Sequence, residues 1–293
     1  MTVNRLDKIS VKVASGEMLN ESDMEAVVAT EDLLALGAIA AARRRKRHGD
    51  RVTFVRVFEV PLPERFDLPV REIPAGAGEV RLVGNPKDGE SAIAATRWMI
   101  GATGSIPLTG FALDDLAEAC GGDSVALSEL LKELKGAGLA GIAEVRMDRL
   151  SDPELIVLAA GSGLVVGRLT VAEANCAVLA RRVADWGSAV DGVRAIAPLS
   201  PTTKVTTGYY DVRQVALARL LVDSIDSIQV DWNLHGPKLA QVALTFGADD
   251  LDAVSPIDSH EEGWRRSPLE EVTRNILAAS FVPLERNGRF ELR

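Results

Sequence analysis

The chain has 293 residues, 47 % of them hydrophobic and 26 % charged, which is the balance of a globular protein long enough to bury a large core. Its formal net charge of −9 and its isoelectric point near 5.0 argue against nucleic acid or an anionic membrane as a partner, because phosphate-binding surfaces need clustered Lys and Arg. The sequence shows neither an apolar run of about 18 residues nor a signal peptide, so we expect no membrane span and a cytoplasmic location.

One basic run, Arg-Arg-Arg-Lys-Arg-His at 43–48, stands against the acidic balance. Cations are stabilised at the negative C-terminal end of a helix, so we interpret the run as a solvated helix end and not as a nucleic-acid patch. The chain has two cysteines, Cys120 and Cys176. We expect both to be small buried thiols, because free cysteine packs as a hydrophobe and a reducing cytosol disfavours disulfides.

The predicted elements begin with two stretches of helical periodicity, 6–16 and 22–47, followed by a β-branched and aromatic strand at 52–60. Four prolines between 61 and 78 indicate a loop. Strand-like and helical segments then alternate. The predicted strands are 79–83, 106–111, 139–145, 164–169, 193–198 and 227–232, with a further apolar segment at 155–160 that precedes 164–169 across Gly161 and Gly163. The predicted helices are 91–100, 124–135, 171–186, 212–222, 238–246 and 267–280.

This alternation favours an α/β fold, a mostly parallel sheet with helices outside it. Six or more such units in one chain favour a TIM-type (β/α) barrel, complete or incomplete, over an open doubly wound sheet. No long repeat or low-complexity segment interrupts the pattern. We therefore predict a single domain over 1–293, with leader helices at 1–50, the barrel at 51–266, and a C-terminal helix and tail at 267–293.

The most informative segment is 228–241, Ile-Gln-Val-Asp-Trp-Asn-Leu-His-Gly-Pro-Lys-Leu-Ala-Gln, which runs into Phe-Gly-Ala-Asp-Asp-Leu-Asp at 246–252. Together with 11–17, 32–37, 43–45 and 48–54 before it in the chain, and with 215–221 and 281–286 around it, it resembles the radical S-adenosylmethionine enzymes of the futalosine route to menaquinone, aminodeoxyfutalosine synthase and dehypoxanthine futalosine cyclase. The related deazaflavin FO synthase shares the likeness. The resemblance implies a TIM-type barrel with a ligand cavity in its mouth.

The chain departs from this family where the family holds a [4Fe–4S] cluster on a CxxxCxxC loop. Residues 59–66, Glu-Val-Pro-Leu-Pro-Glu-Arg-Phe, stand there without a thiol, and two cysteines are too few for a cluster that takes three or four. The family's glycine run near S-adenosylmethionine is also replaced, by Ala-Gly-Ile-Ala-Glu at 140–144. We therefore predict a degenerate member with no cofactor, no iron–sulfur cluster and no radical chemistry.

Candidate catalytic residues are Asp249, Asp250 and His235. The Gly-Ala-Asp-Asp-Leu-Asp segment is expected to be a turn closing the last barrel strand, and carboxylates at that rim can act as acid or base. A helix cap or an arginine pair explains them equally well. His235 follows the preceding strand, where it serves either as a proton carrier or as a histidine bonded to backbone.

Candidate ligand-binding residues are Trp232, Asn233 and Asp252 from the same segment, and Lys204 from a threonine-rich loop that suits a carboxylate or phosphate. A metal site is not predicted, because the sequence contains no HxH, HExxH or CxxC motif. The glycines of 161–167 lack the GxGxxG spacing, and we interpret them as a turn between buried segments.

Three functional hypotheses remain open. The first is a non-radical role linked to menaquinone biosynthesis, with a nucleoside or aromatic carboxylate bound in the barrel mouth. The second is a lyase or hydrolase that uses Asp249 or Asp250 with His235, and the third is a structural or regulatory partner of a homologous radical enzyme. An open, polar mouth supports the first hypothesis, whereas a mouth filled by 61–78 supports the third.

Overall fold

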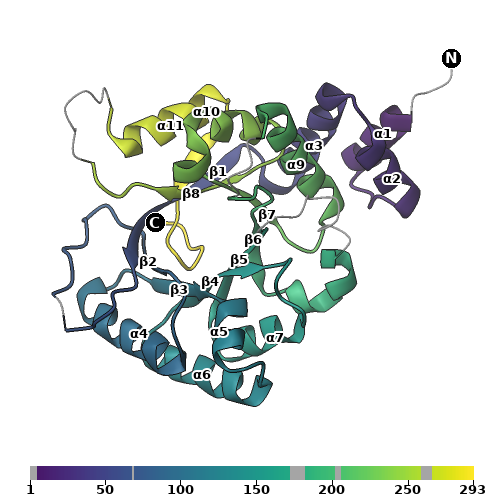
Figure 1. Cartoon of the computed structure of the whole chain (residues 1–293). Helices are drawn as coiled ribbons and strands as arrows, with labels where there is room; N and C mark the ends of the chain where they lie inside the picture. The colour runs from purple at the N-terminus through teal and green to yellow at the C-terminus, as the bar shows by residue number, and fades with distance from the viewer. Residues whose placement is uncertain (1–4, 68, 172–181, 202–205, 259–265) are drawn as a thin grey trace.

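Eight parallel strands form a closed barrel (Figure 1). The computed structural model describes residues 5–67, 69–171, 182–201, 206–258 and 266–293. Each strand pairs with the next in chain order, and β1 pairs with both β2 and β8, which closes the ring. The strands are β1 (Arg51–Pro61), β2 (Glu79–Val83), β3 (Leu108–Ala112), β4 (Gly141–Arg146), β5 (Val165–Thr170), β6 (Val193–Ile196), β7 (Ser227–Asp231) and β8 (Asp250–Val254). The predicted TIM-type fold is confirmed, and the barrel is complete.

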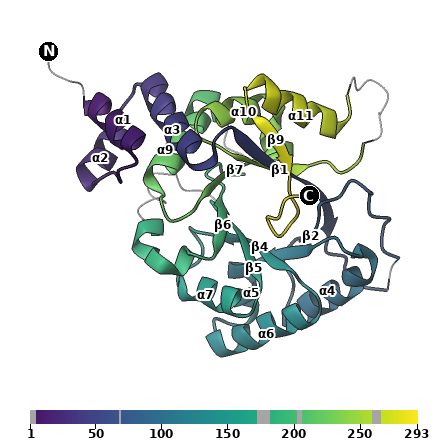
Figure 2. The same ribbon diagram turned by 180° about the vertical axis from the view of Figure 1, so that it is seen from behind.

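Helices surround the barrel and cover the outer faces of its strands (Figures 1 and 2). They are α4 (Gly89–Thr103), α5 (Leu113–Ala119), α6 (Ser124–Gly136), α7 (Glu154–Gly161), α9 (Gly208–Leu221), α10 (Trp232–Thr245) and α11 (Pro268–Ala278), with a short 3-10 turn η1 (Gly187–Val190). Because helices cover the outside and side chains fill the inside, every residue of β3 and β8 is buried. Gly236, at φ 79°, and Pro237 kink α10 near its start.

Three further helices, α1 (Arg5–Ser15), α2 (Glu21–Ala29) and α3 (Leu33–His48), precede the barrel; α2 and α3 lie against α9, and α1 packs on α2 and α3 (Figure 2). The predicted helix 22–47 is therefore two helices, because Asp32 caps a new N-terminus by accepting the N–H of Ala35. The basic run does end a helix, and Arg45 and Lys46 are exposed as predicted, but Arg43 and Arg44 are buried. Arg44 is 1 % exposed, donates to the carbonyls of Ala248 and Gly49, and lies 3.9 Å above the ring of Phe281.

A ninth strand, β9 (Val282–Glu285), pairs in parallel with the first half of β1. The tail that follows it turns into the barrel, where Figure 1 shows its yellow trace inside the ring of strands. Arg286 is 2 % exposed, and the N–H of Gly288 donates to the carbonyl of Gly78, just before β2. The tail therefore closes the end of the barrel at which the strands begin.

The other predicted elements mostly agree with the structure, and one error matters for the site. After β1 ends at Pro61, the described residues up to 78 form the predicted loop. The predicted turn of 161–167 is confirmed at 162–164, between α7, which contains the segment 155–160, and β5, which begins at Val165. Most of the predicted helix 171–186 lies outside the described residues. Residues 249–252 were expected to form a turn after the last barrel strand, whereas Asp250 begins β8. Within the described ranges, no helix is long and apolar enough to cross a membrane.

Candidate ligand-binding site

A cavity of about 570 Å³ opens at the carboxyl ends of β4 to β7. In barrels of this kind, binding and catalytic residues lie at this end. Apolar side chains such as Val171, Leu199 and Leu234 form part of its wall. Its charged and amide-bearing side chains are Glu144, Arg146, Arg149, Arg168, Gln229, Asp231 and His235.

Below the cavity, Asp252 of β8 joins two arginines across the barrel interior. Both guanidinium NH groups of Arg81 donate to it, each at 2.8 Å, and Arg168 forms a further ion pair with the same carboxylate. Burial would raise the pKa of Asp252, but Arg81 and Arg168 outweigh burial and hold that pKa well below its usual range. Glu79 accepts from Arg81 at 2.8 Å and from Thr109 at 2.5 Å. The charges of this layer are therefore paired with one another.

Nearer the closed end, Asp250 is the centre of a second buried layer. Arg286 donates to both of its carboxylate oxygens, at 2.6 and 2.7 Å. Thr53 donates at 2.5 Å, and the Nε2 of Gln229 donates at 2.7 Å. This carboxylate has a structural role, because each of its partners holds a different part of the barrel in place.

The structure does not assemble the predicted acid–base pair of Asp249 or Asp250 with His235. Both aspartates lie at the beginning of β8, whereas His235 follows the end of β7 and lines the mouth cavity. Since all barrel strands are parallel, these are opposite ends of the barrel. Asp249 is instead paired with the fully buried Arg219 and accepts from Ser227 at 2.7 Å. The arginine-pair interpretation of the two aspartates therefore fits the structure.

The four predicted ligand-binding residues have different positions. Trp232 is buried at the start of α10 and Asn233 is exposed, and neither lines the cavity. Asp252 lies beneath the cavity and is occupied by its two arginines. Lys204 lies outside the described residues.

Asp231 lies in the segment 228–241 and lines the mouth cavity, although it is not among the candidate residues predicted from the sequence. It ends β7, lines the cavity and caps α10 by accepting the N–H of Leu234 at 2.8 Å. Burial raises its pKa, and the charge of Asp252, its neighbour in the β7–β8 register, raises it further. Its position at the carboxyl end of a predicted strand was the available signal.

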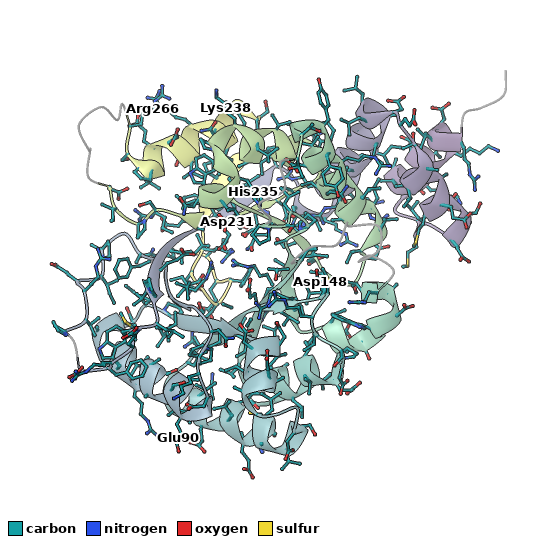
Figure 3. The ribbon with its side chains drawn as sticks, viewed as in Figure 1. Glu90, Asp148, Asp231, His235, Lys238 and Arg266 are labelled. Atoms are coloured by element: carbon teal, nitrogen blue, oxygen red, sulfur yellow. The ribbon has the colours of Figure 1, made fainter. Side chains whose placement is uncertain are left out.

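His235 lies one helical turn beyond Asp231, and both are labelled at the start of α10 in Figure 3. Burial lowers the pKa of His235 below its ordinary 6.5, against the opposing charges of Asp231 and Asp211. Its ring makes no hydrogen bond or ion pair with the residues that the structure describes, so the backbone-bonded interpretation finds no support there. The imidazole is therefore available to a molecule in the cavity.

The arginines of the cavity differ in what they already bind. Arg146 is paired with Asp114 and Asp115, and Arg168 with Asp252. Arg149, in the loop after β4, is exposed, and its guanidinium has no hydrogen-bond or ion-pair partner within the described ranges. It is therefore the cation best able to receive an anion at the rim.

The segment in place of the family's cysteine loop does not fit an iron–sulfur cluster. It offers no thiol, and Leu62 and Phe66 pack against the hydrophobic core instead. The ring of Phe66 lies 6.2 Å from that of Trp98 on α4. Cys120 is half-buried at the end of α5, and Cys176 lies outside the described residues. Among the described side chains no group of three or more His, Cys, Asp or Glu is arranged to hold a metal, and the absence of metal and cofactor stays a prediction.

The fold defines a (β/α)8-barrel protein with a cavity lined by polar and charged side chains in its mouth. Residues 184–293 match the family model described as the CofH/MqnC C-terminal region. Aminodeoxyfutalosine synthase of Streptomyces coelicolor is 35 % identical over 100 residues, which cover 32 % of this chain and 26 % of that protein. Cyclic dehypoxanthine futalosine synthase of the same organism is 29 % identical over 123 residues, 38 % of this chain and 31 % of the relative. The matched segments thus span about a quarter to a third of these relatives.

A third relative is a 5-amino-6-(D-ribitylamino)uracil–L-tyrosine 4-hydroxyphenyl transferase of Methanococcus maripaludis, 32 % identical over 33 % of this chain and 29 % of its own length. Among solved structures, methylornithine synthase (PylB) has a TM-score of 0.64 at 14 % identity, over 94 % of this chain and 97 % of its own. The hydrogenase maturase HydG has a TM-score of 0.62 at 12 % identity, over 97 % and 76 % of the two chains. The structural likeness shows the fold, and the predicted homology to the futalosine-route enzymes is confirmed over the C-terminal part of the chain.

Proposed function

We propose that this chain binds a nucleoside or an aromatic carboxylate in the barrel mouth, in a non-radical role linked to menaquinone biosynthesis. The observation that carries the proposal is the open cavity of about 570 Å³, which is lined by the guanidinium of Arg149 and the ring of His235, two groups with no hydrogen-bond or ion-pair partner among the described side chains. None of the described residues of the loop at 61–78 lines this cavity. A mouth filled by that loop would have favoured a scaffold.

The composition of the wall supports a small molecule with an apolar body and an anionic group. Leu199 and Leu234 offer apolar surface, while Arg149 offers a charge that no carboxylate of the described residues neutralises by contact. Arg binds a carboxylate through two parallel N–H donors, which gives such a contact direction as well as strength. A ring carrying a carboxylate meets both requirements.

The cysteine content and the packing of the replacing loop support a role without radical chemistry. Radical generation in the resembling family needs an electron from the cluster, and Pro61–Phe66 contains no cysteine that could hold the cluster.

A second candidate is an acid–base enzyme, a lyase or hydrolase, that uses Asp231 with His235. Both side chains line the cavity one helical turn apart, and burial moves the pKa of the carboxyl up and that of the imidazole down. Groups shifted in this way can exchange a proton near neutral pH. In this hypothesis Asp231 replaces Asp249 or Asp250 as the partner of His235, because those two aspartates lie at the opposite end of the barrel.

A thermal-shift titration tests the proposal. The probes are S-adenosylmethionine, adenosine, dehypoxanthine futalosine and 3-substituted benzoates, each at millimolar concentration. A ligand at 100 times its dissociation constant adds about 2.7 kcal/mol to the free energy of unfolding, which the midpoint reports. We expect a saturable shift with a benzoate or a nucleoside.

The matched variants are Arg149→Gln at the cavity rim and Arg289→Gln in the tail at the other end of the barrel, both exposed arginines. The first should weaken carboxylate binding, and the second should leave it unchanged. If none of the probes shifts the midpoint, the ligand-binding proposal is wrong, and a docking role beside an active homologue becomes the better hypothesis.

A further inference from the structure

Arg146 is the last residue of β4 and lies at the edge of the mouth cavity. It shares one face of the strand with Glu144, two residues earlier, and both side chains line the cavity. The carbonyl of Arg146 accepts the N–H of Arg149 at 3.0 Å, which closes a turn directly after the strand. In such a turn the Cα atoms of the first and fourth residues lie within about 7 Å of each other. Since Arg149 also lines the cavity, the two arginines are neighbours on one wall of it.

Two aspartates in the first turn of α5 hold the guanidinium of Arg146. Its Nε donates to Oδ2 of Asp114 at 2.7 Å, its Nη2 lies 2.6 Å from the same oxygen, and Nη2 also donates to Asp115. The backbone N–H of Arg146 donates to the other oxygen of Asp114 at 3.2 Å. Burial would lower the pKa of Arg146, but Asp114 and Asp115 outweigh burial and raise that pKa. The guanidinium is therefore charged and fixed in direction before a ligand arrives.

One nitrogen of this guanidinium is not used by the aspartates. Nη1 of Arg146 makes no hydrogen bond with the described residues, and it is not among their buried unpartnered atoms, so water reaches it. The side chain of Arg146 is 19 % exposed, and neither aspartate lines the cavity. The guanidinium is planar, and its Nε–Nη2 edge is occupied by Asp114 and Asp115. Nη1 is therefore the donor that Arg146 has left for a molecule in the cavity.

We propose that Arg146 is the fixed half of a two-arginine site, in which its Nη1 and the guanidinium of Arg149 receive the same ligand carboxylate. Asp114 and Asp115 act through Arg146 as positioning residues. This inference rests on the proposed function and narrows its ligand class to a carboxylate, in preference to an uncharged nucleoside. A carboxylate offers two oxygens and about four lone-pair sites, so it can accept from both arginines at once. Because Arg146 is already held in place, binding to it orders less of the protein than binding to the exposed Arg149 alone.

Isothermal titration calorimetry of the full chain tests this with three probes: 3-hydroxybenzoate, its neutral analogue 3-hydroxybenzamide, and adenosine. We expect the carboxylate to bind more tightly than the amide. Arg146→Lys should weaken binding of the carboxylate about tenfold, the size of one charge-assisted hydrogen bond, and change binding of the amide less than about twofold. The variant keeps the positive charge, so the loss reports the donor geometry of the arginine and not its charge.

The matched control is Arg182→Lys. Arg182 donates to the carbonyl of Met147 at 2.7 Å, in the same turn, but it does not line the cavity. This variant should bind 3-hydroxybenzoate as the unmodified chain does. An equal loss in Arg146→Lys and Arg182→Lys would overturn the inference, because disturbance of the turn would then explain both.

Asp115 tests the positioning. Asp115→Ala removes a negative charge beside the site, so charge alone would strengthen binding of the carboxylate, whereas the loss of a fixed Arg146 should weaken it about threefold. Asp115→Asn removes the same charge but keeps an acceptor for Nη2, and it should restore the affinity. Tighter binding in Asp115→Ala would overturn the positioning role.

Unchanged binding of 3-hydroxybenzoate in Arg146→Lys would overturn this inference and leave the proposed function standing on Arg149. Binding of adenosine without binding of the carboxylate would do the same. If neither compound binds at millimolar concentration, the proposed function and the inference are both wrong. Should Arg146→Lys not fold, a crystal structure of the unmodified chain with 3-hydroxybenzoate decides. A carboxylate within hydrogen-bond distance of Nη1 of Arg146 supports the inference, and a carboxylate held by Arg149 alone overturns it.

Discussion

Arg286 and Asp250 form a buried bidentate ion pair, with Nε to Oδ2 at 2.6 Å and the second guanidinium nitrogen to Oδ1 at 2.7 Å. The pair joins the tail that follows the last strand to the beginning of β8, 36 residues earlier in the chain. Burial would lower the pKa of Arg286, but the charge of Asp250 outweighs it and raises that pKa. The closed end of the barrel therefore depends on a contact that only the folded chain can make.

Replacing Arg286 by Met should destabilise the protein strongly, because Asp250 would remain as a buried charge with only neutral donors. We expect a loss of about 3–5 kcal/mol in the free energy of unfolding, measured by urea denaturation. Arg289→Gln, an exposed position in the same tail, should change it by less than about 0.5 kcal/mol. Equal losses in the two variants would contradict a structural role for the ion pair.

Asp252→Asn should be similarly costly, because it leaves Arg81 and Arg168 buried without their shared carboxylate. We expect a loss of about 3–5 kcal/mol at pH 7. The folded pKa of Asp252 lies below the ordinary 3.8, so its stabilisation is present above that pH and is lost as the pH falls further. The unmodified chain should therefore lose stability more steeply below pH 4 than Asp252→Asn, and a parallel pH dependence of the two urea midpoints would argue against this account.

Removing the charge of Asp231 should affect the free energy of unfolding in the opposite direction from removing that of Asp252. Its folded pKa is raised above 3.8, so its negative charge reduces stability at neutral pH, and that penalty disappears as the pH falls through the folded pKa. Asp231→Asn removes the charge and keeps a side-chain cap for α10, so its unfolding midpoint at pH 7 should match or exceed that of the unmodified chain. Asp231→Ala removes the cap as well and should lose about 1 kcal/mol relative to Asp231→Asn.

His235 should make carboxylate binding depend on pH. Its pKa lies below 6.5, so the ring is neutral at pH 7 and becomes a further cation in the cavity lining when the pH falls below the folded pKa. Affinity for a 3-substituted benzoate should rise severalfold as the pH falls from 7 through the folded pKa of His235, since protonation of a histidine adds a charge that favours an anion. The carboxylates whose charges act on the ring are Asp231 and Asp211, and both favour its protonation. In His235→Gln the calorimetric affinity should be flat over this range, and a retained slope would assign the effect to another group.

The arginines of α3 give a matched pair for stability. Arg44 is 1 % exposed and binds carbonyls on three sides, whereas the side chain of Arg45 is 62 % exposed and lies 3.6 Å from Asp50. Burial lowers the pKa of Arg44 to about 10. Arg44→Gln should cost about 2–4 kcal/mol in thermal or urea unfolding, because it leaves buried carbonyls without donors, whereas Arg45→Gln should cost less than about 0.5 kcal/mol. Equal costs would restore the solvated interpretation of this run.

Local pattern alone determined most of the fold. Alternating apolar runs and helix signals predicted β1, β2 and the helices around them. The side-chain periods of a strand, 2.0 residues, and of a helix, 3.6 residues, both depend only on residues close together in the sequence. The segment 228–241 carried the family likeness for the same reason. Strand β8 was not predicted, because its acidic first residues are typical of a turn. It forms a strand because Arg286 and Arg81, far away in the chain, neutralise Asp250 and Asp252.

The site itself was decided by tertiary structure. The sequence indicated that His235 follows a strand, but it could not show that Asp249 and Asp250 lie at the other end of the barrel, because this depends on where β8 begins. Nor could it show that Arg146 and Arg168 are paired with carboxylates while Arg149 has no partner among the described residues, or that Asp250 accepts a hydrogen bond from the amide of Gln229. These outcomes depend on charge pairing between residues up to 171 positions apart, and such pairing exists only once the barrel has closed.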